Sequence, residues 1–134
     1  MSGETSLRRL LATMAPRRRP GRFVFVTVDA VPTDVEVCAS VAEAEGLSVV
    51  VSQDDADRLG LAYEFVAGWI TLQVHSALSA VGLTASVSAA LTEENISCNV
   101  VAGNRHDHLL VPVERADDAV AVLRDLAERA SDDR

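Results

Sequence analysis

Aromatic residues, long apolar runs and secretion signals are scarce or missing in the sequence, and each shortage limits what the protein can be. Aromatic side chains make up 4% of the 134 residues, so a folded core must consist mainly of Val, Leu, Ile and Ala. No segment approaches the roughly 20 apolar residues that a transmembrane helix needs. No signal-peptide pattern is present, because Arg8 and Arg9 interrupt the apolar residues near the N-terminus. We therefore expect a cytoplasmic protein with no membrane partner.

Positive charge is also scarce. The chain has 12 basic and 20 acidic residues, and its formal net charge is −8. Proteins that bind nucleic acid usually present a basic face, so we expect no nucleic-acid partner. The basic residues cluster once, in residues 17–20 (RRRP) and at Arg22, and we predict that this cluster is a solvated loop.

The two cysteines and three histidines give only weak signs of a metal site. In a reducing cytoplasm Cys38 and Cys98 are expected to stay reduced, although the sequence alone does not exclude a disulfide between them. His106 and His108 would share one face of a strand and could chelate an ion, with His75 and Cys98 joining them. We expect Cys98 to face the core, however, and an H-x-H pair alone is a weak motif. We predict no bound metal and no cofactor.

Catalytic motifs are missing as well. The sequence has no G-x-S-x-G elbow, and it places no nucleophile at a strained turn between a strand and a helix. The stretch Asn104 to His108 (NRHDH) contains His and Asp, but Asn and Asp are also common turn formers. We predict a hairpin turn here, and a protein that is not an enzyme.

Periodicity predicts an α+β fold in which two halves, 1–66 and 67–134, are fused. In the first half it predicts helices at 6–14 and 53–59, strands at 22–28, 35–44 and 47–52, and a possible strand at 63–67. In the second half it predicts strands at 69–74, 97–102 and 108–113, and helices at 83–94 and 115–130. Each half lacks one strand of a ferredoxin-like βαββαβ unit. We therefore predict that the halves share strands in one antiparallel sheet, with the helices on one face.

A small-molecule site is predicted where residues 75–82 lead into a helix. Free N–H groups at a helix N-terminus suit a carboxylate, and Gly82 would let the backbone approach a ligand closely. Asn99 offers a side-chain amide from a neighbouring strand, on the opposite face from Cys98. The alternative is that the small residues of this loop serve only tight packing between helix and sheet. The residue pattern leaves both interpretations open.

The stretch ITLQVHSALSAVGLTASVSAALTEENISCNVVAGNRHDHLLVPV, residues 70–113, resembles the core of an ACT domain. Together with GLSVVV at 46–51, it is similar to stand-alone bacterial proteins that carry two ACT-like halves and no attached enzyme. The resemblance implies a regulatory fold that binds amino acids or similar metabolites at interfaces between ACT units.

The resemblance also implies the positions of the ligand-binding residues. They are Ser76, Val81, Gly82 and Leu83 in the loop, and Asn99, Val100, Arg105, His106 and Asp107 in the following hairpin. Where relatives carry an aromatic pair, this chain has Asn104 and Arg105, so Arg105 would meet a carboxylate and Asp107 an amino group. We expect a non-catalytic regulatory protein that binds an amino-acid-like effector. The alternative is a ligand-free module for protein interaction or oligomerisation, such as a homodimer.

Overall fold

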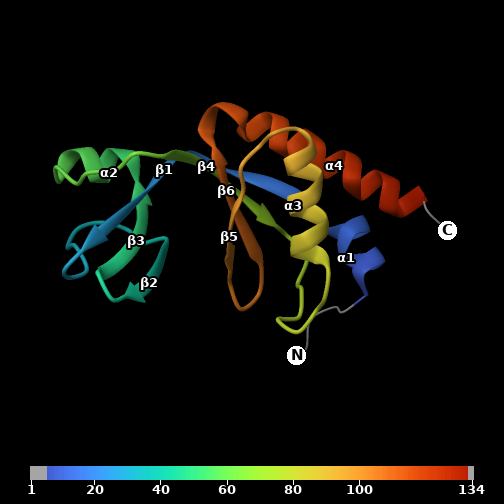
Figure 1. Cartoon of the computed structure of the whole chain (residues 1–134), viewed down its shortest axis with the longest axis horizontal. Helices are drawn as coiled ribbons and strands as arrows, with labels where there is room; N and C mark the ends of the chain where they lie inside the picture. The colour runs from blue at the N-terminus through green and yellow to red at the C-terminus, as the bar shows by residue number, and fades with distance from the viewer. Residues whose placement is uncertain (1–5, 133–134) are drawn as a thin grey trace.

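Strands rich in Val build the centre of the structure, a computed structural model that describes residues 6–132 (Figure 1). The strands are β1 (Pro16–Val28), β2 (Ala39–Glu43), β3 (Gly46–Ser52), β4 (Val66–Leu72), β5 (Asn99–Ala102) and β6 (Asp107–Pro112). The helices are α1 (Leu7–Thr13), α2 (Gln53–Arg58), α3 (Leu83–Glu93) and α4 (Ala116–Asp132), with a 3-10 turn, Val113–Arg115, before α4. Within this range no helix has the length and apolar character that a membrane span requires.

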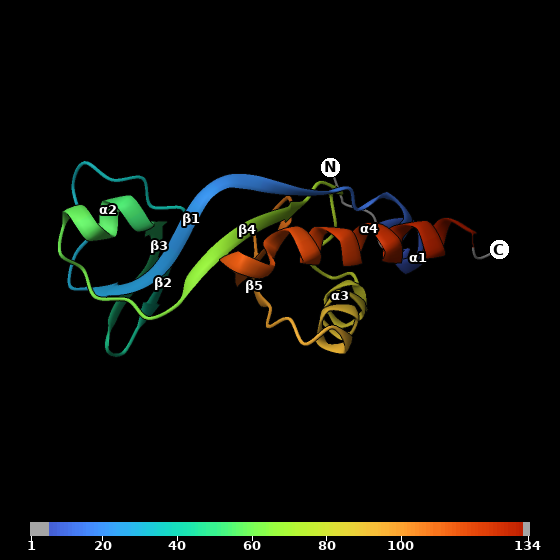
Figure 2. The same cartoon turned by 90° about the horizontal axis from the view of Figure 1, so that it is seen from above.

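All six strands belong to one sheet, in the order β2-β3-β1-β4-β6-β5, and every neighbouring pair is antiparallel. The two central strands, β1 and β4, run along the length of the molecule and join its two ends (Figure 2). At one end lies α2, and at the other lie α1, α3 and α4 (Figure 1). The predicted sharing of strands between the halves is therefore confirmed.

The shared strands let six strands build two ferredoxin-like units. Pro16–Arg19, at the start of β1, pairs with the end of β4 and completes the unit that contains β6 and β5. Phe23–Val28, at the end of β1, pairs with β3 and completes the unit that contains β2. The register of β1 against β4 shifts between Arg19 and Phe23, where Gly21 has a φ of 105°. This β-bulge separates the two parts of β1, since a bulge bends its strand and interrupts the ladder locally.

Alternation along each strand separates a helix-covered face from an open face. On the helix face, the larger core joins sheet residues to α1, α3 and α4. Its members include Ile70, Leu72, Leu109, Val111, Leu10, Met14, Leu83, Val87, Leu91 and Leu123. A second core on the same face lies between α2 and Val24, Val26, Val49 and Val51. On the open face the buried residues are Phe23, Val50, Ala67, Trp69 and Leu110.

The C-terminal end of α3 follows the sequence prediction closely. Asn95 has a φ of 57°, in the left-handed region that ends helices. The N–H of Ile96 donates to the carbonyl of Leu91 at 3.0 Å, and the N–H of Asn95 donates to Thr92 at 2.9 Å. Ile96 is buried beside Leu91. This pair of bonds is the Schellman motif, so the predicted helix end is confirmed.

Two local predictions are wrong. Residues 17–20 lie inside β1 and not in a loop. Their backbone pairs with β4, and their charged head groups reach solvent or an acidic partner, so the positive charge does not prevent a strand. Arg18, for example, donates to Asp117 of α4 at 2.8 Å. Residues 63–65 lie outside β4, which begins at Val66. The Tyr63 hydroxyl instead donates to Asp57 of α2 at 2.7 Å, so this segment follows the helix before the strand starts.

Candidate functional site

The loop between β4 and α3 carries the first group of predicted ligand residues. Gly82 precedes α3 with a φ of 103°, and a Cβ at this position would lie 2.9 Å from Cδ2 of Leu7. Glycine is therefore required both by the backbone conformation and by the packing of α1. Because Gly82 has no side chain to cap α3, no side-chain hydrogen bond covers the first turn of this helix.

The rest of the loop is partly open to solvent. Leu78 is 70% exposed and Val81 is 82% exposed, whereas Leu83 is buried in the core. Ser76 is half-buried, and its hydroxyl donates to the carbonyl of Ala77 at 3.3 Å. The loop thus presents two large apolar side chains to solvent beside a helix N-terminus, an arrangement that can contact the apolar part of a ligand.

The hairpin tip lies against the start of the same loop. The N–H of Gly103 donates to the carbonyl of His106 at 2.9 Å and closes the turn that carries the exposed Arg105. A ring nitrogen of His106, Nδ1, lies 3.3 Å from the carbonyl oxygen of Val74. This contact brings the tip, with Arg105, His106 and Asp107, next to the loop that leads to Gly82.

Asp107 begins β6 on the helix face of the sheet. Asp107 pairs with Ala102 of β5. Leu109, two residues further along β6, pairs with Val100, and both contact the larger core on the helix face. Because alternate residues of a strand share a face, Asp107 lies on that face too. Partial burial raises the pKa of the Asp107 carboxyl, and the nearby His108 and His106 oppose that rise. The structure therefore holds a carboxylate at a position where its ionised form is disfavoured, which is common at binding sites.

Replacing Asp107 with Asn is expected to raise the melting temperature at neutral pH. A raised folded-state pKa means that the ionised carboxylate reduces stability above that pKa, and Asn removes this penalty. The gain should shrink as the pH falls through the folded-state pKa, and vanish below the pKa of the unfolded chain, about 3.9. Thermal melts of both proteins at about pH 7 and about pH 3.5 measure it. An equal difference in melting temperature at both pH values would contradict this account.

The predicted residue Asn99 is not brought together with this group. Asn99 lies on the open face of edge strand β5, opposite Leu110, and its Nδ2 donates to the Leu110 carbonyl at 3.4 Å. Cys98, one residue earlier, packs on the helix-face core as predicted, and burial raises the pKa of its thiol to about 11. In a single chain the sheet therefore separates Asn99 from Asp107.

The two histidines of the H-x-H pair make different contacts. His106 contacts Val74, whereas Nδ1 of His108 lies 2.9 Å from Oγ1 of Thr71 on the open face. Burial, together with the charges of His106 and Arg19, lowers the pKa of His108, and Asp107 opposes this effect. Within residues 6–132, no three His, Cys, Asp or Glu side chains come together as metal ligands.

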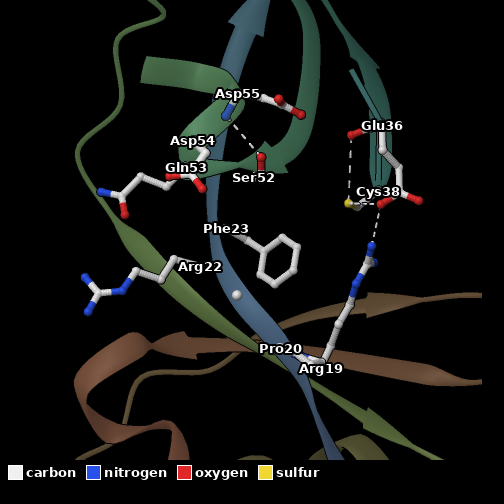
Figure 3. Close-up of a pocket in the computed structure, with 11 residues that line it drawn as sticks. Arg19, Pro20, Arg22, Phe23, Glu36, Cys38, Ser52, Gln53, Asp54 and Asp55 are labelled. Carbon is white, nitrogen blue, oxygen red and sulfur yellow. Dashed lines mark hydrogen bonds and ion pairs between the residues drawn. The ribbon is translucent and has the colours of Figure 1, made fainter. Parts of the chain in front are cut away.

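A cleft at the β-bulge, here called the junction cleft, was not anticipated from the sequence (Figure 3). It has a volume of about 480 Å³ and lies between the bulge, Glu36, Cys38 and the start of α2. Arg19 donates to Glu36 at 2.5 Å, and its guanidinium lies 5.0 Å from the ring centre of Phe23 and 5.3 Å from that of Trp69. The sequence held one signal for this bulge, the pair Pro20-Gly21, because Pro or Gly within a strand often marks a β-bulge.

Comparison with known proteins identifies related domains along the whole chain. Residues 2–68 and residues 64–125 each match a family model described as an ACT domain. A protein of unknown function from Vibrio cholerae, described as a possible transport protein, is 40% identical. That match covers 92% of this chain and 97% of the other, with a TM-score of 0.81. No functionally curated protein matches the chain significantly.

More distant solved structures share the fold alone. The regulatory subunit of aspartate kinase from Thermus thermophilus, in its ligand-free form, has a TM-score of 0.63 and 10% identity. The alignment covers 86% of this chain and 97% of that subunit. A protein from Agrobacterium tumefaciens has a TM-score of 0.65 and 18% identity, covering 84% and 87% of the two chains.

Proposed function

Because the chain belongs to the ACT-domain family and carries two consecutive ACT units, we propose that it is a regulatory protein that binds a small amino-acid-like effector without catalysing a reaction. We place the division between the two ACT-like halves near residue 66, although the shared strands mean that each unit borrows part of the other half. The fold common to this chain and a regulatory subunit of aspartate kinase supports a regulatory, ligand-binding role.

The effector site that we propose combines the loop that includes residues 76–83 with the hairpin tip. The observation that carries it is the 3.3 Å contact between Nδ1 of His106 and the carbonyl oxygen of Val74, which joins the two segments. The N–H groups at the start of α3 and the guanidinium of Arg105 would bind the carboxylate of the effector. Asp107 would accept a hydrogen bond from its amino group.

The remaining predicted residues fit this assignment in different ways. Ser76, Val81, Gly82 and Leu83 would line the loop side of the effector, and Val100 would support Asp107 from the neighbouring strand. Asn99 lies on the far face of β5, an edge strand, so it would reach an effector only across an interface between two copies of the chain. The proposal therefore includes a homodimer in which such an interface forms.

A thermal-shift screen of the 20 amino acids against ligand-free protein tests the proposal. At a concentration about 100 times the dissociation constant, a ligand stabilises the folded state by about 2.7 kcal/mol. For a chain of this size we expect the melting temperature to rise by several degrees. Arg105→Gln should greatly reduce this shift, since it removes the proposed partner of the carboxylate.

The matched control is Arg129→Gln, because Arg129 lies near the end of α4 and pairs only with Asp125, at 3.1 Å, among the interactions described. It should leave the shift unchanged. If no amino acid raises the melting temperature at millimolar concentration, or if both variants lose the shift equally, the proposed site is wrong.

An oligomerisation module is the second candidate function, and the open face favours it. Val41 of edge strand β2 is 60% exposed and Phe25 is 36% exposed, and both line one small apolar hollow with Val101 of β5. Exposed apolar residues beside a free strand edge often mark an interface.

If this function holds, Val41→Glu should convert a dimer into a monomer in light scattering, while the melting temperature of the variant stays near that of wild type. An unchanged mass would rule out an interface centred on Val41.

A further inference from the structure

A chain of polar contacts on the open face of the sheet leads from β4 to the hairpin tip. The indole N–H of Trp69 donates to Oγ1 of Thr71 at 3.0 Å, and the same oxygen lies 2.9 Å from Nδ1 of His108. Thr71 follows Trp69 by two residues on β4 and pairs directly with His108 of β6. The three side chains therefore share one face, and the register of the sheet brings them together.

The hydroxyl of Thr71 decides which nitrogen of His108 carries a proton. An indole N–H can only donate, so Thr71 accepts one hydrogen bond, and its own hydroxyl proton remains for a second partner. Among residues 6–132, Nδ1 of His108 is the one acceptor described for that proton. The hydroxyl is therefore assigned as the donor to an unprotonated Nδ1, which leaves the proton of the neutral ring on Nε2.

The other edge of the His108 ring lies against the turn between β5 and β6 (Figure 1). A Cβ on Gly103 would lie 3.2 Å from Nε2 of His108 and 3.0 Å from the carbonyl oxygen of His106. The N–H of Gly103 donates to that same carbonyl at 2.9 Å and closes the turn. The ring of His108 therefore connects Thr71 in the sheet to the turn that presents Arg105.

The charged groups around His108 come from the turn and from β1. Burial lowers the pKa of the His108 imidazole, the charges of His106 and Arg19 lower it further, and the charge of Asp107 opposes them. His106 itself makes a different kind of contact. A carbonyl oxygen can only accept, so Nδ1 of His106 must carry a proton to bond with Val74, and this contact survives protonation of its ring.

The strands on either side of β6 add no charge to this environment. β4 and β5 contain no titratable side chain, and Val101 of β5 pairs with His108. The ring of Trp69, 5.2 Å from that of His108, would attract an imidazolium. Arg19 already lies 5.3 Å from the centre of the same indole ring, however, so a second cation there would be repelled by the first.

We propose that His108 is a pH-sensitive anchor of the hairpin tip: the neutral ring accepts from Thr71 and holds the turn, and protonation releases it. A protonated Nδ1 can no longer accept the hydroxyl proton of Thr71. The half-buried imidazolium would also face Arg19 and His106, so the charged ring is expected to leave its place for solvent.

This anchor gives the effector site a means of regulation by pH, an extension that rests on the proposed function. The turn presents Arg105, the proposed partner of the effector carboxylate. The imidazolium of His108 would also act electrostatically on Asp107, the proposed partner of the amino group. Acid should therefore weaken effector binding, whereas the loosening of the turn itself needs no effector.

Long-range proton–nitrogen NMR spectra of the histidine rings in the ligand-free chain test the anchor. At about pH 7.5 we expect Nδ1 of His108 to be unprotonated. Thr71→Val removes the donor and should raise the pKa of His108 toward its ordinary value of 6.5, whereas Thr71→Ser keeps a hydroxyl and should preserve the lowered pKa. The matched control is Thr27→Val, on the same face of β1 but opposite Ser48, and it should change nothing. A protonated Nδ1 in the neutral ring, or an unchanged pKa in Thr71→Val, would overturn the proposal.

Hydrogen exchange of the Gly103 amide tests the release of the turn. Its protection factor should fall about tenfold for each pH unit below the pKa of His108. His108→Asn, whose Oδ1 can accept from Thr71 but does not titrate, should show no such fall, and circular dichroism verifies that this variant folds. If wild type and His108→Asn lose protection equally, another group controls the turn and the proposal is wrong.

The pH profile of effector binding separates this inference from the proposed function. With an amino acid that raises the melting temperature, the dissociation constant of wild type should rise up to about tenfold per pH unit below the pKa of His108. In His108→Asn this rise should be absent. If no amino acid binds, the effector site is wrong, while the NMR and exchange results still decide the anchor. If wild type and His108→Asn show the same pH profile, His108 does not regulate the site.

Discussion

Replacing Gly68 with Ala is expected to lower the free energy of unfolding by about 1–3 kcal/mol, the usual cost of overpacking a core. Gly68 lies in the middle of β4, on the helix face, and is buried. A Cβ at this position would lie 2.7 Å from Cβ of Ala116, the first residue of α4. Ala116 is fully buried. Its Cβ is bonded directly to the backbone of α4 and has no rotamer that could avoid the contact, so the helix itself would have to move.

The companion substitution Ala116→Gly makes this prediction specific. It removes the methyl group that Gly68→Ala would meet, so the double variant should be more stable than the sum of the two single effects predicts. Urea denaturation of the four proteins gives the coupling energy from the double-mutant cycle. A coupling energy of zero, or a Gly68→Ala variant as stable as wild type, would show that the strand and helix do not approach this closely.

Replacing Trp69 with Ala is expected to cost about 3–5 kcal/mol, as for other buried aromatic residues. Trp69 is 4% exposed and pairs with Arg19, at the place where the register of β1 against β4 shifts. Its ring centre lies 5.5 Å from that of Phe23 and 5.2 Å from that of His108. Its indole N–H donates to the hydroxyl of Thr71 at 3.0 Å. The side chain therefore connects both units on the open face.

Far-UV circular dichroism in urea measures this effect, because Trp69 is the only tryptophan and its fluorescence is lost in the variant. Both units should unfold in one transition, since they share β1 and β4. Trp69→Phe is the matched control and should retain part of the stability, because it preserves an aromatic ring but not the bond to Thr71. A cost below about 1 kcal/mol for Trp69→Ala would contradict the packing described here.

The features predicted correctly from the sequence depend on local chemistry. The pattern of apolar residues located β3 and α3, and the left-handed preference of Asn predicted the end of α3. Alternation also placed Cys98 and Asn99 on opposite faces of their strand. The incomplete strand count of each half was enough to predict that strands are shared.

The features that were missed depend on tertiary contacts. Arg17 and Arg19 belong to β1 because β4 supplies their pairing partners. On the open face their charged head groups can meet solvent or an acidic side chain, as Arg19 meets Glu36. Neither the pairing strand nor the acidic partner can be inferred from residues 17–20 alone. The junction cleft arises from the bulge in β1 and from the approach of Glu36, Cys38 and the start of α2 to it. The candidate effector residues followed from the family resemblance, whereas the contact between His106 and Val74 required the fold.

Hydrogen exchange of backbone amides, with and without a saturating amino acid that raises the melting temperature, tests the central claim most directly. The proposed effector site predicts that new protection concentrates in two segments, residues 74–86 and residues 103–107. Each segment should lose this protection in Arg105→Gln. Protection confined to residues 19–23 and 52–55, which belong to the junction cleft of Figure 3, would contradict the claim and place the effector there instead.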